Sequence, residues 1–306
     1  MPLNHNGHSC SHTHHSSGES NLIITICLNV IITIAEFVGG LLSGSLALLS
    51  DAFHNMSDVI TLIISYIAIL IGKREKDTGK TYGYKRAEII AAFVNVLALF
   101  LVCGYIIFEA FHRLTHPSPI NVKLMLIIAA IGLAANGISV LMLFRDAKKN
   151  INIKSAFLHL MADTLSSVAV IVTAVILIFK PWFWLDAVMS ILITIYIAKE
   201  SLSLLFESVH ILMQGSPKNI DGEQVKQRIM TLDKFDIEDI HHIHMWEVSP
   251  GNVVFDAHIV VKREHLAESD VILCAIKSIL SKEYGIHHST LQLESLNQGQ
   301  CSICEI

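Results

Sequence analysis

Two short stretches of the sequence each place a histidine four residues before an aspartate within an apolar segment. The first pair is His54 and Asp58, and the second is His159 and Asp163. Residues four apart share one face of an α-helix, so each pair presents an imidazole nitrogen beside a carboxylate oxygen. Two such faces turned toward each other supply four ligands. This mixed set suits Zn²⁺ best and Cd²⁺ or Co²⁺ next, whereas Mg²⁺ and Ca²⁺ prefer mostly oxygen.

The interpretation of these pairs depends on their surroundings. In a soluble helix a single pair of this kind is usually solvated or hydrogen-bonded within the protein. In a membrane-spanning helix an ionisable group costs about 2.5–3.5 kcal/mol on insertion scales and is seldom kept without a function. We therefore predict a metal site on condition that both segments are transmembrane.

The composition of the chain indicates a multi-pass integral membrane protein surrounded by lipid. Of the 306 residues, 52% are hydrophobic and only 16% are charged. The mean hydropathy of +0.55 is too high for an ordinary soluble domain. The net charge is -5, and no basic stripe with interleaved aromatic residues occurs, so nucleic acid is not expected as a partner. The six cysteines are scattered, unlike those of a secreted disulfide framework.

Six apolar runs are each near the roughly 20 residues needed to cross a bilayer. They cover residues 22–42, 46–72, 88–112, 121–144, 155–179 and 183–206. Six spans place both termini on one side of the membrane. The second-to-third and fourth-to-fifth connectors carry ten Lys and Arg residues, and the other three connectors carry only three. By the positive-inside rule, both termini face the cytoplasm, and we expect the plasma membrane, the inner membrane of a bacterium, as the location.

The two His and Asp pairs meet at one depth only if the fifth helix begins early. The second span has its midpoint near residue 59, which places Asp58 near the bilayer centre. The apolar part of the fifth span begins after Lys154, and a helix starting there would leave His159 near the cytoplasmic interface. We therefore predict that the fifth helix begins before Lys154.

Two further polar residues lie within one helical turn of His54. Asp51 and Asn55 are placed to orient the His54 ring or to line an aqueous path. An equally good alternative is that each makes a hydrogen bond that packs one helix against another.

The N-terminal tail, residues 1–20, is rich in His, Ser, Gly and Asn and has no apolar residues that could build a core, so we expect a flexible segment. It has no basic region typical of a signal peptide. Its His8, Cys10 and His12 form a His-x-Cys-x-His motif, and the C-terminal tail, residues 297–306, contains the pair Cys301 and Cys304. A Cys-x2-Cys pair supplies two zinc ligands and needs two more, which the N-terminal motif can provide.

The character of the chain changes after Gly215, Ser216 and Pro217. Residues 21–212 are expected to form the six-helix transmembrane domain, and residues 213–296 a small soluble α+β domain in the cytoplasm. Its pattern predicts a helix over 219–232, strands over 236–248 and 252–262, a helix over 266–283 and a strand over 289–294. This order, αββαβ, predicts a small antiparallel or mixed sheet with helices on one face.

The soluble domain is rich in histidine. His241, His242 and His244 lie on the first predicted strand and His258 on the second, and His287, His288 and Glu294 lie near the last strand. Alternate residues of a strand share a face, which predicts His242 and His244 on one face and His241 on the other. Each alone is more often a surface or core residue. Clustered on neighbouring strands with a carboxylate, they indicate a second, cytoplasmic metal site.

Four motifs of the chain resemble those of the cation diffusion facilitator family. They are SLALLSDAFHNMSD at 45–58, YGYKRAE at 82–88, HLMAD at 159–163 and the His-x-x-His-x-Trp motif at 241–246. The pattern is most similar to the branch that exports zinc, cobalt and cadmium. The resemblance covers nearly the whole chain after the N-terminal tail, and its paired motifs are specific.

The resemblance implies a homodimer in which each six-helix bundle exchanges a divalent cation for protons by alternating access, with ferredoxin-like cytoplasmic domains forming a second dimer contact. It assigns the transport ligands to His54, Asp58, His159 and Asp163. It assigns the cytoplasmic ligands to His241, His258, His287 and Glu294, with His242 and His288 as alternatives to their neighbours. It assigns a further cytoplasmic site to Cys301 and Cys304, completed by His8, Cys10 and His12 of the same chain or of the partner chain.

Two other functions compete with transport. One is a membrane-bound metal sensor, which is disfavoured because no kinase, nucleotide-binding or DNA-binding signature follows the spans. The other is an intramembrane metallopeptidase, which is disfavoured because the sequence contains no His-Glu-x-x-His motif. We therefore do not expect an enzyme.

Overall fold

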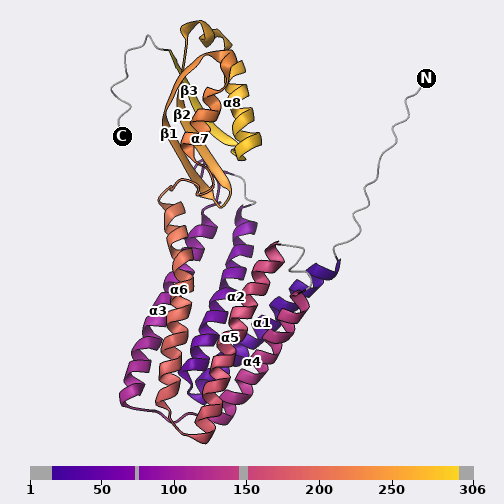
Figure 1. The fold of residues 1–306 in the computed structure, drawn as a ribbon, viewed down its shortest axis with the longest axis vertical. Coiled ribbons are helices and arrows are strands. Elements are labelled where there is room, and N and C mark those ends of the chain that lie inside the picture. Colours follow the sequence, from indigo (N-terminus) through magenta and orange to yellow (C-terminus); the bar gives the residue numbers. More distant parts are fainter. Residues whose placement is uncertain (1–15, 73–75, 145–150, 296–306) are drawn as a thin grey trace, which may run out of the picture. The chain divides into compact units, whose positions relative to one another are not determined.

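The computed structural model describes residues 16–72, 76–144 and 151–295. Within them are six long helices of 22 to 29 residues each. They are α1 (Ser16–Ser43), α2 (Leu46–Gly72), α3 (Ala87–Thr115), α4 (Val122–Leu143), α5 (Ile151–Phe179) and α6 (Trp184–Leu212) (Figure 1). Among the described residues, α3, α6 and the longer parts of α4 and α5 are long and apolar enough to cross a membrane, and α1 contributes a shorter apolar piece, Asn29–Ser43.

The fifth helix begins before Lys154, as predicted. Its first residue is Ile151 and its last is Phe179, so Asp163 lies two residues before its midpoint. In α2, Asp58 lies one residue before the midpoint. The two aspartates therefore occupy equivalent depths in helices of similar length, which is the condition for the two pairs to form one site.

The described residues form two compact units, and the first comprises residues 16–60, 98–144 and 151–199. In this unit α4 packs between α1 and α5 (Figure 1). The interior is apolar, because each helix turns one stripe of aliphatic residues inward. Its largest cluster combines residues of five helices: Ala47, Leu48, Leu99, Cys103, Ile120, Met125, Ala129, Val170, Ala174, Leu177, Ile193 and Ile197.

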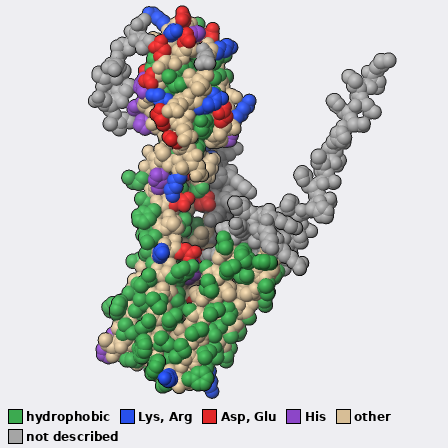
Figure 2. All heavy atoms as spheres, in the orientation of Figure 1, with side chains coloured by type: hydrophobic (Ala, Val, Ile, Leu, Met, Phe, Trp, Pro, Cys, Tyr) green, Lys and Arg blue, Asp and Glu red, His purple; other side chains and the backbone are tan. Residues whose placement is uncertain are grey.

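The outer surface of the long helices is also apolar. Leu101 and Phe179 are about four-fifths exposed, and hydrophobic side chains cover the helices on the face seen in Figure 2. A helix that is apolar on all sides suits a lipid surrounding, because lipid does not penalise exposed hydrocarbon as water does. The membrane location expected from the sequence is thus visible in the packing.

The start of α2 is held by a buried carboxylate on α6. Asp186 accepts hydrogen bonds from Ser45 Oγ (2.6 Å) and from the backbone N–H of Leu46 (2.8 Å). These groups are free donors at a helix N-terminus, where negative charge is favourable. Just before them Gly44 adopts a left-handed φ of 74° and its carbonyl accepts a hydrogen bond from Arg113. Together these contacts fix where α2 begins, and so the register at which it presents His54.

The second unit comprises Thr61–Leu97 and Glu200–Ile306. Its C-terminal part contains α7 (Gly222–Met230), β1 (Ile237–Ser249), β2 (Asn252–Val261), α8 (Ser269–Tyr284) and β3 (His288–Ser295), with short 3₁₀ helices at Asp233–Phe235 and Arg263–Glu268. The sheet order is β1-β2-β3, in which β2 runs antiparallel to β1 and parallel to β3. The αββαβ order and the mixed sheet agree with the prediction. The helix predicted over 266–283 begins later, as α8 at Ser269, because the chain before it forms the 3₁₀ helix Arg263–Glu268.

One face of this sheet carries the core of the soluble domain. On β2, Phe255, Ala257 and Ile259 are buried among the apolar residues of α7 and α8, and α7 lies beside both β1 and α8. The intervening residues Asp256 and His258 point to the opposite face, because successive strand residues alternate. The helix-free face is therefore the one on which polar side chains of three strands meet.

Candidate metal centres

The first centre brings together a histidine of α2 and carboxylates of two helices. His54 Nε2 lies 3.7 Å from Asp58 Oδ2, one turn along α2, and 3.6 Å from Asp163 Oδ1 on α5. His54 and Asp163 are almost fully buried, at 6% and 2% exposure. The two pairs singled out in the sequence are thus joined through His54.

The spacing of these atoms fits a zinc ion. Four ligand atoms at bonds of about 2.0–2.2 Å from a tetrahedral Zn²⁺ lie roughly 3.3–3.6 Å from one another. The two distances from His54 Nε2 lie at and just above the upper end of that range, so an ion can be seated with only small side-chain movement. The fourth predicted ligand, His159, lies on α5, but its side chain is outside the described residues. Its role stays a prediction.

The polar neighbours of His54 bond to other helices. Asn55 Nδ2 donates to Glu36 Oε2 on α1 (2.8 Å), and Asp51 accepts from Ser166 and Ser167 on α5. Glu36 on α1 and Asp51 and Asn55 on α2 are each about 1% exposed. These are the helix-packing hydrogen bonds that the sequence left as the alternative, and they hold α1, α2 and α5 together directly beside the His54 site.

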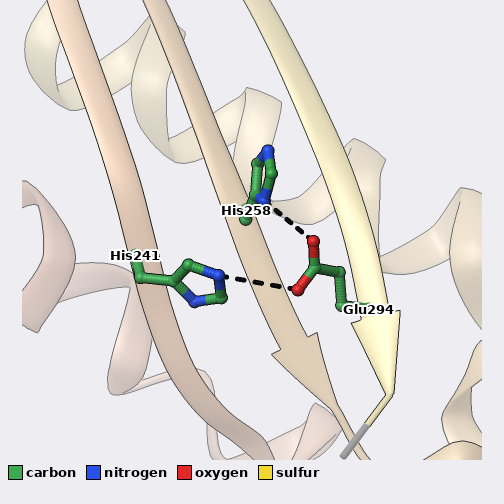
Figure 3. Close-up of side chains that lie close together, drawn as sticks. All are labelled: His241, His258 and Glu294. Atoms are coloured by element: carbon green, nitrogen blue, oxygen red, sulfur yellow. Dashed lines mark ion pairs between the residues drawn. The ribbon is translucent and has the colours of Figure 1, made fainter. Parts of the chain in front are cut away.

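The second centre lies on the helix-free face of the sheet. His258 Nδ1 on β2 is 2.8 Å from Glu294 Oε1, and His241 Nε2 on β1 is 3.5 Å from Glu294 Oε2. Both rings point toward the Glu294 carboxylate of β3 (Figure 3). One ligand atom from each residue falls within 4.8 Å of the other two. Three strands therefore offer two nitrogens and one oxygen close enough for one zinc ion to reach all three after small side-chain movements.

A β-bulge decides which histidines share this face. The alternation of strand residues predicted His242 and His244 together and His241 opposite. The prediction is wrong for His241, whereas His242 and His244 do lie together. His241 pairs with His258 and His244 pairs with Asp256, so two residues of β1 oppose a single residue of β2 between these pairs. The extra residue, His242, has a left-handed φ of 53°, and the bulge brings His241 and His244 onto one face.

The bulge also places His242 against its neighbours. Its ring centroid is 4.5 Å from that of His244 and 4.9 Å from that of His258, and its Nε2 is 3.3 Å from His244 Nε2. Burial and then the charge of the nearby histidines lower the pKa of His242. A histidine kept neutral retains a lone pair for a metal, so His242 remains an alternative ligand beside His241.

The carboxylate of Asp239, two residues before His241 on β1, is fixed by a hydrogen bond from α7. Asp239 Oδ2 lies 3.6 Å from His241 Nδ1, and Asp239 Oδ1 accepts from Lys226 Nζ of α7 at 2.8 Å. The hydrogen bond from Lys226 lowers the pKa of Asp239. An ionised carboxylate behind a histidine favours the tautomer that leaves the other ring nitrogen, Nε2, facing a metal.

The structure places His287 away from this group. Its Nδ1 is 3.0 Å from Ser281 Oγ of α8, and it precedes β3 at His288, whereas Glu294 lies six residues further along the same strand. At about 3.3 Å per residue these two ends are roughly 20 Å apart. His288 contacts the ring of Tyr82 instead. His287 makes its described contact with Ser281 and not with the His241, His258 and Glu294 group. Its assignment as a ligand stays a prediction.

The remaining predicted ligands, His8, Cys10, His12, Cys301 and Cys304, lie outside the described residues. A group that the sequence did not single out is Asp236, Glu264 and His265, whose ligand atoms also lie within 4.8 Å of one another. Lys262 Nζ is 2.8 Å from Asp236 Oδ2, and this hydrogen bond lowers the pKa of Asp236. A lysine already neutralises that carboxylate, so the group is an ion-pair cluster.

The chain matches two models of one protein family. The cation efflux transmembrane domain matches residues 22–213, and the cation efflux cytoplasmic domain matches residues 217–296. The first match covers the six long helices and the second covers the αββαβ domain. Both metal centres thus lie in the domains that define the family.

Several bacterial transporters are similar over almost the whole chain. The cadmium, cobalt and zinc/H(+)-K(+) antiporter of Bacillus velezensis is 37% identical over 96% of this chain and 96% of its own length. The zinc transporter ZitB of Pectobacterium atrosepticum is 36% identical, over 93% and 88%. The metal cation efflux system protein CzcD of Cupriavidus metallidurans is 36% identical, over 94% and 90%. As its motifs predicted, this chain belongs to the cation diffusion facilitator, or cation efflux, family, whose members are membrane transporters and not enzymes.

Proposed function

We propose that this protein exports zinc from the cytoplasm in exchange for protons, with cadmium or cobalt as further substrates. The ion would pass through the His54, Asp58, His159 and Asp163 site by alternating access. The observation that carries the proposal is the position of His54 Nε2, 3.6–3.7 Å from carboxylates of α2 and α5. The names of the similar transporters, which act on zinc, cadmium and cobalt, support it. They also disfavour a metal sensor.

The exchange with protons follows from the chemistry of the ligands. A histidine must be neutral and an aspartate ionised to bind a metal, so zinc and protons compete for the same atoms. The unperturbed pKa of histidine, about 6.5, lies close to physiological pH. Loading zinc from the cytoplasm thus releases protons, and protons that enter from the opposite side release zinc. Movement of α2 against α5 would open and close this site, because the ligands come from both helices.

We propose that the protein works as a homodimer in the plasma membrane of a bacterium with both termini in the cytoplasm. The basic connectors between the second and third and between the fourth and fifth spans support this orientation. The match to a cytoplasmic domain after the last span is consistent with it. This domain would form one of the contacts between the two protomers.

We further propose that the His241, His258 and Glu294 group binds a regulatory zinc ion. The three ligand atoms fit the ion without rearrangement of the sheet, and Asp239 supports His241 from behind. When bound, the ion would crosslink three strands and so stiffen the helix-free face. The other predicted cytoplasmic ligands are not part of this group: His287 lies at the opposite end of β3 from Glu294, and the tail residues His8, Cys10, His12, Cys301 and Cys304 lie outside the described residues.

The transport proposal is tested by zinc uptake into acid-loaded proteoliposomes. The unmodified protein should take up zinc as the pH gradient dissipates, and Asp58→Ala should lower the rate by more than about 100-fold, since even residues that only support a ligand change metal affinity 10–100-fold. Asp270→Asn, at an exposed position of α8, controls for loss of a carboxylate. Full flux in Asp58→Ala would remove the proposed site.

A further inference from the structure

A cleft of about 580 Å³ lies entirely within the second unit. It is lined from one side by the connector between α2 and α3, through Lys76, Tyr82 and Lys85. From the other side it is lined by the β1–β2 hairpin and by the residues at the start of β3, including Asn252 and His288. Its volume is in the range of small-molecule sites. Its lining includes none of His54, Asp163, His241, His258 and Glu294, but it does include His287 and His288, which the sequence offered as cytoplasmic ligands.

The charge of the cleft is positive. Lys76 and Lys85 both line it, and among the described lining residues none is acidic. Lys85 Nζ donates to a neutral partner, Asn252 Oδ1, at 3.2 Å. The two ammonium groups oppose the binding of a divalent cation, and they favour an anion at the same place.

Among the described residues of the connector, 76–86, the one acid is Asp77, and it shapes the connector itself. Asp77 accepts hydrogen bonds from the backbone N–H groups of Gly79 and Lys80, both at 2.7 Å, and from Tyr84 Oη at 2.8 Å. These bonds lower the pKa of Asp77, and Asp77 is not a lining residue. These hydrogen bonds therefore give the loop that carries the two lysines a defined conformation.

The wall of the cleft is apolar where the rim is basic. Val248, Val253 and Val254 line it and are buried, and the Tyr82 ring packs edge-on against His288 at 5.6 Å. A bare inorganic ion would use only the lysines. An apolar wall beside two ammonium groups suits a phosphate group that is attached to an organic body.

We propose that this cleft binds a phosphate ester between Lys76 and Lys85. The connector directly follows α2, which ends at Gly72, and basic residues at the cytoplasmic end of a membrane helix commonly contact the phosphate of anionic lipids. The same chemistry would accept a soluble phosphate ester. Bound there, the phosphate links the end of α2, the helix that carries His54, to the sheet that carries the second metal centre.

The test measures the melting temperature of the purified full chain, in neutral detergent with a chelator to keep zinc out, during titration with dioctanoyl phosphatidylglycerol. Dioctanoyl phosphatidylcholine, in which the choline ammonium balances the phosphate charge, is the comparison without net charge, and glycerol 3-phosphate is the soluble arm. Lys76→Gln and Lys85→Gln should each raise the half-maximal concentration of phosphatidylglycerol by about fivefold, the usual effect of losing one basic residue on the binding of an anionic headgroup. The double variant should raise this concentration by about 25-fold if the two lysines act independently.

Two variants separate charge from structure. Lys80→Gln removes the same charge from an exposed position of the same connector that does not line the cleft, and it should leave the titration unchanged. Asn252→Asp keeps a partner for Lys85 but adds a negative charge, so it should weaken binding without lowering the melting temperature of the ligand-free protein.

A response to phosphatidylglycerol alone identifies a lipid headgroup as the ligand, and a response to glycerol 3-phosphate as well identifies a soluble phosphate ester. The absence of any response would overturn the proposal, as would equal responses in the unmodified protein and the Lys76→Gln, Lys85→Gln double variant. Since zinc is excluded throughout, the result does not depend on transport.

Discussion

The two candidate metal centres use similar ligands but differ in burial. At the membrane centre His54 and Asp163 are almost fully buried, and the Asp58 side chain is 29% exposed. At the cytoplasmic centre the side chains of His241, Glu294 and His258 are 42%, 29% and 15% exposed. An ion at the buried centre must give up its water, so binding there depends on every ligand and on its protonation. An ion at the exposed centre keeps water within reach. Under the proposed roles, this comparison predicts that the first centre selects and releases its ion, and that the second exchanges its ion readily with the solvent.

Loss of one ligand from each centre should separate their roles most strongly. Asp163→Asn removes a buried charge that the ion needs and should lower zinc flux by more than about 100-fold. Glu294→Gln, the same chemical change at the exposed centre, should lower the flux by less than about threefold at saturating zinc, because exposed ligand positions are partly replaced by water. Flux in proteoliposomes measures both. Equal losses would mean that the two centres act as one.

The packing around the buried centre predicts a smaller effect, on stability. Asn55→Ala removes the donor to Glu36 and leaves a buried carboxylate unpaired, which should cost about 1–3 kcal/mol. Ser167→Ala removes a longer hydrogen bond to Asp51, which keeps its bond from Ser166, and should cost about 1 kcal/mol or less. Chemical denaturation in detergent compares the two. A larger loss of stability for Ser167→Ala would show that the hydrogen bond between Asn55 and Glu36 contributes less than the one between Ser167 and Asp51.

The exposed centre predicts a small pH effect. Because burial and neighbouring histidines depress the pKa of His242 in the folded state, the unfolded chain binds a proton there more readily. The contribution of the neutral ring to stability is present above about pH 6.5 and is lost as the pH falls through the lower folded pKa. His242→Ala should therefore flatten the decline in melting temperature of the metal-free protein between neutral and mildly acidic pH. An unchanged profile would assign that decline to other groups.

The positions of the buried ligands could be predicted from the sequence. A spacing of four residues fixes a shared helix face, and the length of the apolar runs sets the depth, which is why the early start of α5 at Ile151 followed from aligning Asp163 with Asp58. The partners of Asp51 and Asn55 could not be predicted. They depend on which helices lie beside α2, and hydrophobic periodicity does not specify that.

The cytoplasmic centre was predicted less completely for a local reason. Strand alternation assumes an unbroken register, and the bulge at His242 shifts every residue before it to the other face relative to those after it. His242 has no turn-forming glycine beside it that would signal the bulge. Similarly, the role of Asp186 in capping α2 joins residues about 140 positions apart and has no local signature.

The central claim is that His54 and Asp163 hold the transported ion, and Co²⁺ absorption tests it most directly. Co²⁺ gives a strong visible spectrum when it is four-coordinate, and it replaces Zn²⁺ at sites of this kind. In a background that carries His241→Ala, His258→Ala, Cys301→Ser and Cys304→Ser, which disables both proposed cytoplasmic sites, the full chain should still show a four-coordinate spectrum, and it should lose that spectrum on further substitution of His54→Ala. A spectrum that persists without His54, or that is absent from the background itself, would contradict the account.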